Sequence, residues 1–452
     1  MNHSLGQFGD LRLDRTGGEM VERMVALGTV CLRALGGARS GELRMNRFLA
    51  NDKVSVQRII DSWSDRTVGA VADRHVLAIQ DTSAITFETG RTCRRDLGAL
   101  NQGNAHGVLA HVMIAVDADT GACLGPVGGT VWNRTGPVTV SHHKRPLNER
   151  ESRRWVDTIA TARSVLAGAS MVTIVGDREA DMYPLWVAPD GAERAFHVLS
   201  RVSADRAVVE GKSLFAVMAA LPVAATRTLE LPARQPGTKA RKAKVAIRFG
   251  AVEIRRPHNE KDRTLPKTTR LSVIEVRELD PPAGVEPILW RLATTHAVAD
   301  IAKACAVIGW YRMRWVIEQL FRTMKSQGLG LEDSQVETAA RLLKLSAIAV
   351  KAACFTMQLV QERDGAHGRP ASDVFDAEEV ATIEALVPTL EGKTERQRNP
   401  HPKASLAWAS WVMGRLGGWN CYYKPPGPIT MGRGLERFRA IHLGRCLVLG
   451  AT

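Results

Sequence analysis

Hydrophobic residues in the first part of the chain recur three and four positions apart and show no strong strand-like alternation. The spacing is clearest over residues 18–35 and 41–50, and it is typical of amphipathic helices that bury one face. We therefore predict a helical N-terminal domain over residues 1–70.

Two short, largely aliphatic runs follow, at residues 76–80 and 171–176, and each leads directly into an aspartate. They predict buried strands that end at Asp81 and Asp177. Between them, residues 107–133 alternate apolar and polar positions around a central turn-forming stretch, which predicts a hairpin. This part of the chain should therefore form a sheet with two aspartates at strand ends.

The pattern changes between residues 196 and 292, where short strand-like segments are separated by Gly and Pro. We predict a β-rich insertion at about residues 196–292. Residues 302–361 are strongly helical, and the remainder is helical and basic with Pro-rich interruptions. The patterns predict an α/β protein with three domains: residues 1–70, residues 71–365 including the insertion, and residues 366–452.

The net charge of the chain indicates the class of molecule that it is expected to bind. The 452 residues include 61 Lys and Arg against 47 Asp and Glu, which leaves a net charge of +14. Residues 232–270 alone hold twelve Lys or Arg and three Asp or Glu, so this segment carries most of the excess. A polyanion such as nucleic acid is the expected partner, although a solvated loop face explains such a local run equally well.

Cysteine and hydropathy patterns bear on the compartment. The seven cysteines are scattered and form no C-x-x-C pair, which argues against a disulfide framework or a thiolate zinc site. The polar N-terminus lacks the apolar core of a signal peptide. The apolar run at residues 342–360 contains two lysines and predicts a buried helix rather than a membrane span. We expect a protein of the reducing cytoplasm that has no membrane contact.

The most informative polar pattern lies in residues 311–325. At about 100° per residue, four polar side chains fall within about 60° of one another on a continuous helix, beside an apolar face. These residues are Tyr311, Arg314, Glu318 and Lys325. Ordinary pairing between residues four apart explains any two of them. It explains less well an acid flanked by cations directly above an apolar face.

Asp81, Asp177 and Glu318 can form one cluster if the two predicted strands lie side by side and the helix packs over them. A single aspartate at a strand end is more often a turn former than a ligand. Three carboxylates, however, suit one or two Mg²⁺ or Mn²⁺ ions. Two such ions activate a water or a 3′-hydroxyl for phosphodiester displacement.

These residues match a known family. The motifs are I-Q-D-T-S at residues 79–83, G-D-R-E-A-D at residues 176–181, and the Y-(2)-R-(3)-E-(6)-K spacing that begins at Tyr311. Segments 45–51, 290–294 and 415–419 add support. The chain resembles, over nearly its whole length, the IS4-family DDE transposases, and most closely the branch that contains the Tn5 transposase.

The resemblance implies an RNase H-like mixed-sheet catalytic core, interrupted by a β-rich insertion before the helix that carries the glutamate. Asp177 and Glu318 are 141 positions apart, which leaves room for such an insertion. By the same resemblance, Asp81, Asp177 and Glu318 are the catalytic metal ligands for Mg²⁺, with Mn²⁺ as a substitute. Tyr311, Arg314 and Lys325 become contacts to the DNA backbone beside the scissile phosphate.

Further DNA contacts are expected outside the carboxylate cluster. The resemblance implies that Trp290 stacks on a base flipped out of the duplex, with Arg201 near the same base. The alternative for Trp290 is a core position in the insertion sheet. The basic segment of the insertion should hold phosphates without reading sequence; its residues are Lys239, Arg241, Lys242, Lys244 and Arg248. In the N-terminal domain, Arg47 is a candidate DNA contact that could equally support the fold.

Glu179 and Asp181 lie near the expected centre by sequence. We expect them to cap or orient the following helix and to pair with Arg178, without a catalytic role.

The implied function is cut-and-paste transposition at the terminal inverted repeats of the element. It proceeds through a nick, a hairpin on the transposon end, and strand transfer of the 3′-hydroxyl into target DNA. The expected partners are double-stranded DNA and a second protomer, joined through the C-terminal helices in a synaptic dimer, with no nucleotide cofactor. Two alternatives remain: a catalytically silent DNA-binding regulator, and a structure-specific nuclease on the same core.

Overall fold

The computed structural model describes most of the chain. The described residues are 5–87, 96–100, 105–134, 151–188, 196–209, 211–231, 241–422 and 424–449. The strands are β1 (His75–Thr86), β2 (Gly107–Asp117), β3 (Cys123–Trp132), β4 (Met171–Gly176), β5 (Phe196–Arg201), β6 (Ala225–Leu231), β7 (Arg241–Arg255), β8 (Thr268–Glu278) and β9 (Leu289–Thr294). The helices are α1 (Leu11–Leu27), α2 (Leu32–Gly36), α3 (Arg39–Ala50), α4 (Val56–Asp61), α5 (Thr67–Ala70), α6 (Arg153–Val165), α7 (Tyr183–Val187), α8 (Leu214–Ala220), α9 (Ile301–Met313), α10 (Trp315–Arg322), α11 (Ala339–Glu362), α12 (Ala377–Leu390), α13 (Leu406–Leu416) and α14 (Pro428–Leu449).

The nine strands found among the described residues form one mixed sheet in the order β3-β2-β1-β4-β5-β9-β8-β7-β6. Strands β1, β4 and β5 are parallel, while β2 and β3 run antiparallel beside β1. The expectation of an α/β protein is confirmed at this level, and the order of the first five strands is consistent with an RNase H-like transposase core. Strand β2 is buried along its whole length, as its continuous apolar sequence requires.

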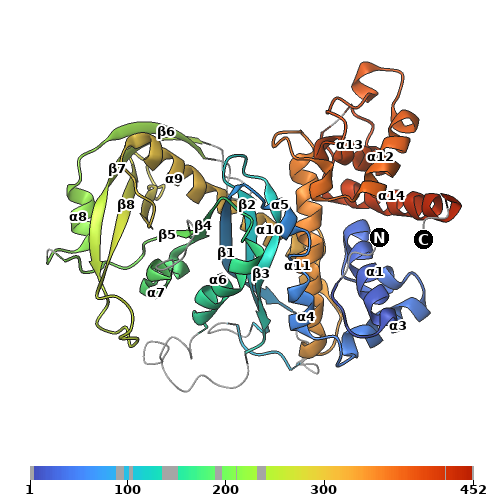
Figure 1. Ribbon diagram of the computed structural model, residues 1–452, viewed down its shortest axis with the longest axis horizontal. Helices are drawn as coiled ribbons and strands as arrows, with labels where there is room; N and C mark the ends of the chain where they lie inside the picture. Colours follow the sequence, from blue (N-terminus) through green and yellow to red (C-terminus); the bar gives the residue numbers. More distant parts are fainter. Residues whose placement is uncertain are drawn as a thin grey trace.

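The β-rich insertion extends this sheet, and its described strands all belong to it. Strand β5, at the start of the region predicted as the insertion, pairs with β4 in the core. Strand β9 then pairs antiparallel with β5 and carries β8, β7 and β6 outward. Figure 1 shows these outer strands as a curved continuation of the central sheet. Sequence patterns identify strands but not their edge partners, so this continuity was not predictable.

Helix α11 lies between the sheet and the terminal helices (Figure 1). It is long and apolar enough to cross a membrane by length and composition, but 78% of its most apolar window is buried inside the protein. Its neighbours include β2 and β3 on one side and α1, α13 and α14 on others. It therefore serves as the buried helix that the sequence predicted.

The N-terminal and C-terminal helices pack against each other. Helix α14 contacts α1 directly, and a Cβ atom at Gly432 would lie only 2.5 Å from the carbonyl oxygen of Val25. Glycine at this position therefore permits the close approach of the two helices. Arg439 of α14 reinforces the contact through an ion pair of 3.6 Å with Glu22 of α1.

Candidate active site

The register of two parallel strands brings the two aspartates together. Ile79 of β1 pairs with Val175 of β4, so Asp81 and Asp177 each follow two residues later on adjacent strands. Asp177 lies directly after β4, as predicted. The prediction that β1 ends at Asp81 is wrong, because β1 continues to Thr86 and Asp81 stays in register with Val112 of β2. The side-by-side arrangement still places both carboxylates at one position on the sheet.

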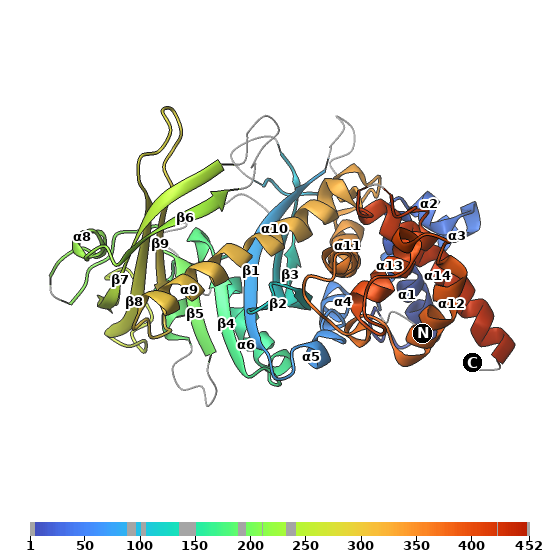
Figure 2. The same ribbon diagram turned by 90° about the horizontal axis from the view of Figure 1, so that it is seen from above.

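The glutamate comes from a helix pair that crosses this position. Helices α9 and α10 run nearly end to end over β5 and β1 (Figure 2). The continuous helix expected over residues 311–325 is interrupted, because α9 ends at Met313 and α10 begins at Trp315. Arg314 occupies the junction, and its side chain is only 10% exposed. The break leaves Tyr311, Arg314 and Glu318 on the same side.

Arg314 contacts all three carboxylates. Its guanidinium lies 3.7 Å from Asp81, 3.6 Å from Asp177 and 2.7 Å from Glu318. The structure thus brings together the three acidic residues that the sequence singled out, around one buried cation. Such an arrangement is compatible with burial only because opposite charges compensate one another.

Tyr311 connects this cluster to the insertion. Its hydroxyl donates a hydrogen bond of 3.0 Å to Asp177, and its ring lies edge-on to Trp290, with ring centroids 5.8 Å apart. Burial, together with the charge of Asp177, raises the pKa of Tyr311 to about 12, so the hydroxyl is a donor at neutral pH. Trp290 of β9 is half-buried and contacts Tyr311, the residue that donates to Asp177.

The electrostatics of the cluster favour a cation. Burial raises the pKa of Asp81 to about 6, although the Thr82 amide, which donates at 2.8 Å, and Arg314 both act to lower it. Burial opposes the charge of Arg314, but Asp177, Tyr311 and Glu318 outweigh it and raise the pKa of the guanidinium. Added positive charge near these carboxylates is therefore stabilising.

The donor set suits a hard divalent cation, because carboxylate oxygens are the protein ligands that Mg²⁺ and Mn²⁺ prefer. In the structure, the Arg314 guanidinium is the shared cationic partner of Asp81, Asp177 and Glu318. A bound ion would replace the guanidinium as the shared positive partner of these groups.

Comparison with known proteins assigns the family. Residues 111–355 match the family described as "Transposase DDE domain". This chain is a DDE transposase. The match covers more than half of the sequence and includes Asp177 and Glu318, whereas Asp81 precedes it. The protein is therefore a phosphoryl-transfer enzyme of a class that generally uses divalent metal ions.

A solved structure similar to the transposase is the "Cryo-EM structure of piggyBac transposase synaptic complex with hairpin DNA (SNHP)". The two chains share 10% sequence identity with a TM-score of 0.43. The alignment covers 95% of this transposase and 72% of that chain.

Lys325 lies apart from the carboxylate cluster of the transposase. It is in the π-helical turn Thr323–Gln327 that follows α10, where the helical phase differs from 100° per residue. Its ammonium group is 3.9 Å from Glu332, which also accepts a hydrogen bond of 3.0 Å from the Thr86 amide at the end of β1. The prediction that four polar side chains share one side of the helix is therefore right for Tyr311, Arg314 and Glu318 and wrong for Lys325.

Arg201 lines a pocket close to Trp290. The guanidinium of Arg201 donates to the carbonyl of Leu289, one residue before Trp290, at 3.1 Å. The pocket has a volume of about 290 Å³ and is also lined by Arg178 and Arg291. Sequence reasoning missed these two arginines as members of one site, because they come from segments more than 100 residues apart.

The predicted phosphate-binding segment of the insertion divides into paired and exposed cations. Arg241 forms an ion pair with the buried Glu278 and Arg248 pairs with the buried Glu275, at 3.2 Å in the second case. Both arginines are therefore held by the sheet, which the prediction did not anticipate. Lys242 and Lys244 are exposed on β7, with Lys242 3.5 Å from Glu230.

Lys239 and Arg47 were also predicted to contact DNA. Lys239 lies outside the described residues. Arg47 is exposed on α3, between the buried Met45 and Phe48. Its position is compatible with a DNA contact and gives no support to a role in the core.

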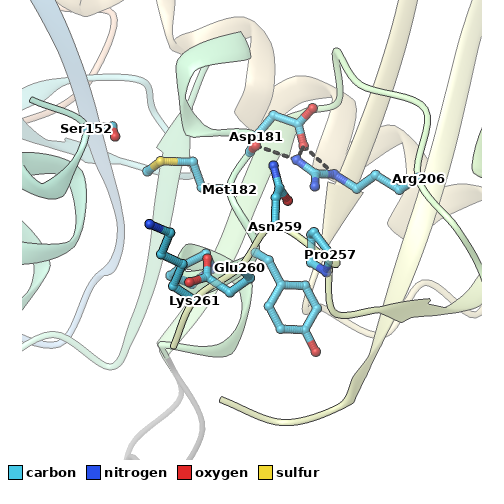
Figure 3. Close-up of a pocket in the computed structure, with 10 residues that line it drawn as sticks. Ser152, Asp181, Met182, Arg206, Pro257, Asn259, Glu260 and Lys261 are labelled. Carbon is cyan, nitrogen blue, oxygen red and sulfur yellow. Dashed lines mark hydrogen bonds and ion pairs between the residues drawn. The ribbon is translucent and has the colours of Figure 1, made fainter. Parts of the chain in front are cut away.

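Asp181 has a structural role different from the expected one. Its carboxylate accepts hydrogen bonds from the amides of Ser203 and Ala204 at 2.7 and 2.8 Å, and it pairs with Arg206. Figure 3 shows Asp181 and Arg206 pointing toward one another at the edge of a pocket. Asp181 therefore fastens the loop after β5, and its expected pairing with Arg178 is replaced by pairing with Arg206.

Proposed function

We propose that the protein is a cut-and-paste DNA transposase of the IS4 family that cuts at the terminal inverted repeats of its own element. It then joins the freed 3′-hydroxyl to target DNA. The observation that carries the proposal is the convergence of Asp81, Asp177 and Glu318 on Arg314, in a chain of the DDE family.

In this proposal, Asp81, Asp177 and Glu318 hold two divalent ions, Mg²⁺ or its substitute Mn²⁺. Bound ions of this kind activate the attacking oxygen and stabilise the leaving oxygen of a phosphodiester. Arg314 orients the carboxylates and turns toward the scissile phosphate, since a guanidinium matches phosphate geometry. Tyr311 holds Asp177 through its hydroxyl and contacts the DNA backbone, and Lys325 contacts the backbone beyond the cluster.

The proposed reaction has four displacements at phosphorus. Water first breaks one strand and leaves a 3′-hydroxyl; this hydroxyl attacks the opposite strand and forms a hairpin on the transposon end. A second water opens the hairpin, and the same 3′-hydroxyl finally attacks target DNA. Each step exchanges one P–O bond for another, so no covalent enzyme intermediate is required.

Trp290 supports the hairpin step. The hairpin requires an unstacked base, and stacking on an aromatic ring offsets part of that cost. Trp290 is half-buried, next to Tyr311 and to the arginine-lined pocket that contains Arg201. We infer that the flipped base stacks on Trp290, with Arg201 beside it.

Two protomers are proposed to act together on double-stranded DNA in the cytoplasm. Helix α14 exposes a group of apolar side chains near its end: Leu443, Leu447 and Val448. Exposed apolar side chains grouped on one helix favour a protein interface. We infer that α13 and α14 contribute to the synaptic dimer.

The test uses the full chain, Mg²⁺ and DNA that carries the element's ends with flanking sequence, resolved on denaturing gels. Asp177→Ala should abolish cleavage and leave end binding intact, whereas Asp157→Ala, at a half-exposed surface ion pair, should cut normally. Binding without cleavage in Mg²⁺ and Mn²⁺ would favour the regulator, and cleavage without joined products would favour the nuclease. Cleavage that persists in Asp177→Ala would refute the assignment of the carboxylates.

A further inference from the structure

A second group of potential metal ligands lies far from the catalytic carboxylates, between α12 and α14. Its members are Glu378, His442 and Cys446, and the ligand atoms of all three lie within 4.8 Å of one another. His442 and Cys446 are one turn apart on α14, and Glu378 is in the first turn of α12. The scattered cysteines argued against a thiolate zinc site in the sequence, because helical spacing reveals only the His–Cys pair and Glu378 enters through tertiary packing.

Neighbouring groups fix the protonation state of His442. The Thr382 hydroxyl donates its single proton to the Glu378 carbonyl at 3.0 Å, so it must accept from Nδ1 of His442, which is 2.8 Å away. Nε2 therefore carries the lone pair, and it points at Cys446 Sγ, 3.6 Å away. This hydroxyl–imidazole arrangement is the kind that orients histidine ligands in metal sites.

The distance between the two donor atoms matches tetrahedral zinc. Zn–N bonds of about 2.0–2.1 Å and Zn–S bonds of about 2.3 Å, at a tetrahedral angle, separate nitrogen and sulfur by about 3.6 Å. The observed Nε2–Sγ distance is 3.6 Å. We propose that Glu378, His442 and Cys446 bind one zinc ion that links α12 to α14.

The charged groups around the cluster are compatible with the positive charge of a zinc ion. The described residues form no ion pair with the exposed Glu378 carboxylate, and Oδ2 of the neighbouring Asp376 is buried without a hydrogen-bond partner. Arg445 of α14, next to Cys446 in sequence, donates a hydrogen bond of 3.3 Å to the carbonyl of Ala381. The exposed side of Glu378 leaves room for a water as the fourth ligand.

The ligand set separates this ion from the catalytic one. A thiolate and an imidazole favour zinc over Mg²⁺, which prefers oxygen ligands. Binding converts the Cys446 thiol to a thiolate and releases its proton to solvent, while His442 is already unprotonated at Nε2. Because the site lies on two helices near the end of the chain, its ion holds α14 in place without taking part in catalysis.

The test uses full-length protein stripped of metal, in an Asp177→Ala background that weakens binding at the catalytic carboxylates. Zinc affinity is measured by competition with a chromophoric chelator, and Co²⁺ serves as the spectroscopic probe. We expect one zinc ion per chain and a thiolate-to-cobalt charge-transfer absorption. Cys446→Ser should remove this absorption and lower zinc affinity at least tenfold, and Thr382→Val should lower affinity about tenfold. The exposed Cys31 provides the matched control, and Cys31→Ser should change neither.

Folding is checked separately, because His442 is buried and its replacement could unfold the region. Cys446 is only partly buried, so Cys446→Ser should retain the helical circular dichroism of the parent. Zinc should raise the melting temperature of the parent and leave that of Cys446→Ser unchanged. Absence of zinc uptake at micromolar concentration, or a cobalt spectrum unchanged by Cys446→Ser, would show that the cluster is only a Cys–His hydrogen bond and would overturn the proposal.

Discussion

The Tyr311 hydroxyl donates a 3.0 Å hydrogen bond to Asp177, a residue 134 positions earlier in the chain. The same ring touches Trp290, so one side chain couples the carboxylate cluster to the insertion. The position of Asp177 therefore depends on packing between the helix and the outer sheet.

Tyr311→Phe keeps the ring and removes this hydrogen bond. A hydrogen bond to a charged group contributes about 1.5–3 kcal/mol, so we predict that the first nick slows by about tenfold to a hundredfold. Binding to transposon ends should be nearly unchanged. Single-turnover cleavage measures the effect, with Tyr422→Phe as the control because Tyr422 is exposed and its hydroxyl bonds to Thr394, far from the carboxylates in sequence. An unchanged rate would remove Tyr311 from the positioning of Asp177.

Trp290→Ala should impair hairpin formation more than the first nick. Base stacking on an aromatic side chain contributes about 1–3 kcal/mol, so the yield of hairpin should fall about five- to hundredfold, while Trp290→Phe should retain part of it. Denaturing gels resolve nicked and hairpin products in the same reaction. If both steps fall together in both variants, Trp290 has only a packing role.

Glu275 holds the outer sheet together through three arginines. It is fully buried on β8 and lies 3.2 to 3.4 Å from Arg248, Arg277 and Arg291. Glu275→Gln leaves these cations without their shared counter-charge. Because the arginines are partly exposed, we predict a loss of about 2–3 kcal/mol in the free energy of unfolding, below the full cost of breaking a buried pair.

Urea denaturation measures the effect of Glu275→Gln, and Glu230→Gln is its matched control. Glu230 pairs with Lys242 on the same sheet, but both side chains are more than 70% exposed. Its loss should change stability by less than about 0.5 kcal/mol. Equal effects of the two substitutions would contradict a structural role for the buried carboxylate.

Acid should destabilise the fold through His296. This ring is 3% exposed and stacks on His197, and burial, with smaller contributions from His197, Lys303 and His75, lowers the pKa of His296 to about 2. In the unfolded chain a histidine has a pKa of about 6.5. Below this pH the unfolded state therefore binds a proton at His296, whereas the native state leaves the ring unprotonated. Stability present above pH 6.5 is therefore lost as the pH falls.

Between about pH 7.5 and pH 5.5, the expected loss from His296 alone is about 1.4 kcal/mol in the free energy of unfolding. Urea denaturation at the two pH values measures it. His296→Gln should flatten the difference, even though it lowers stability at neutral pH by disturbing the contact with Thr173. A pH difference that is the same in both proteins would exclude His296 as its source.

Much of the candidate site could be predicted from local sequence patterns. Alternation and helical spacing are local properties, so the strands that lead to Asp81 and Asp177 and the helices around Glu318 could be predicted from short windows. The DDE family and its phosphoryl-transfer chemistry were also predictable, because they rest on residue types at fixed spacings. The local helical phase placed Tyr311, Arg314 and Glu318 on one side, and the structure retains this relationship.

Tertiary structure alone decided what these patterns could not contain. The pairing of β1 with β4, which aligns Asp81 with Asp177, joins segments almost 100 residues apart, and no local periodicity encodes such a register. The break at Arg314 and the π-helical turn at Lys325 are not marked in the spacing of apolar residues, so the continuous helix was a wrong extrapolation. The sequence predicted that Arg241 and Arg248 are free to bind phosphates, because their buried acidic partners lie on another strand. Sequence thus determined which side chains are available and where most helices and strands form. Long-range packing decided which charged groups lie together. The reason is that the energy of a buried charge depends on neighbours that only the folded chain supplies.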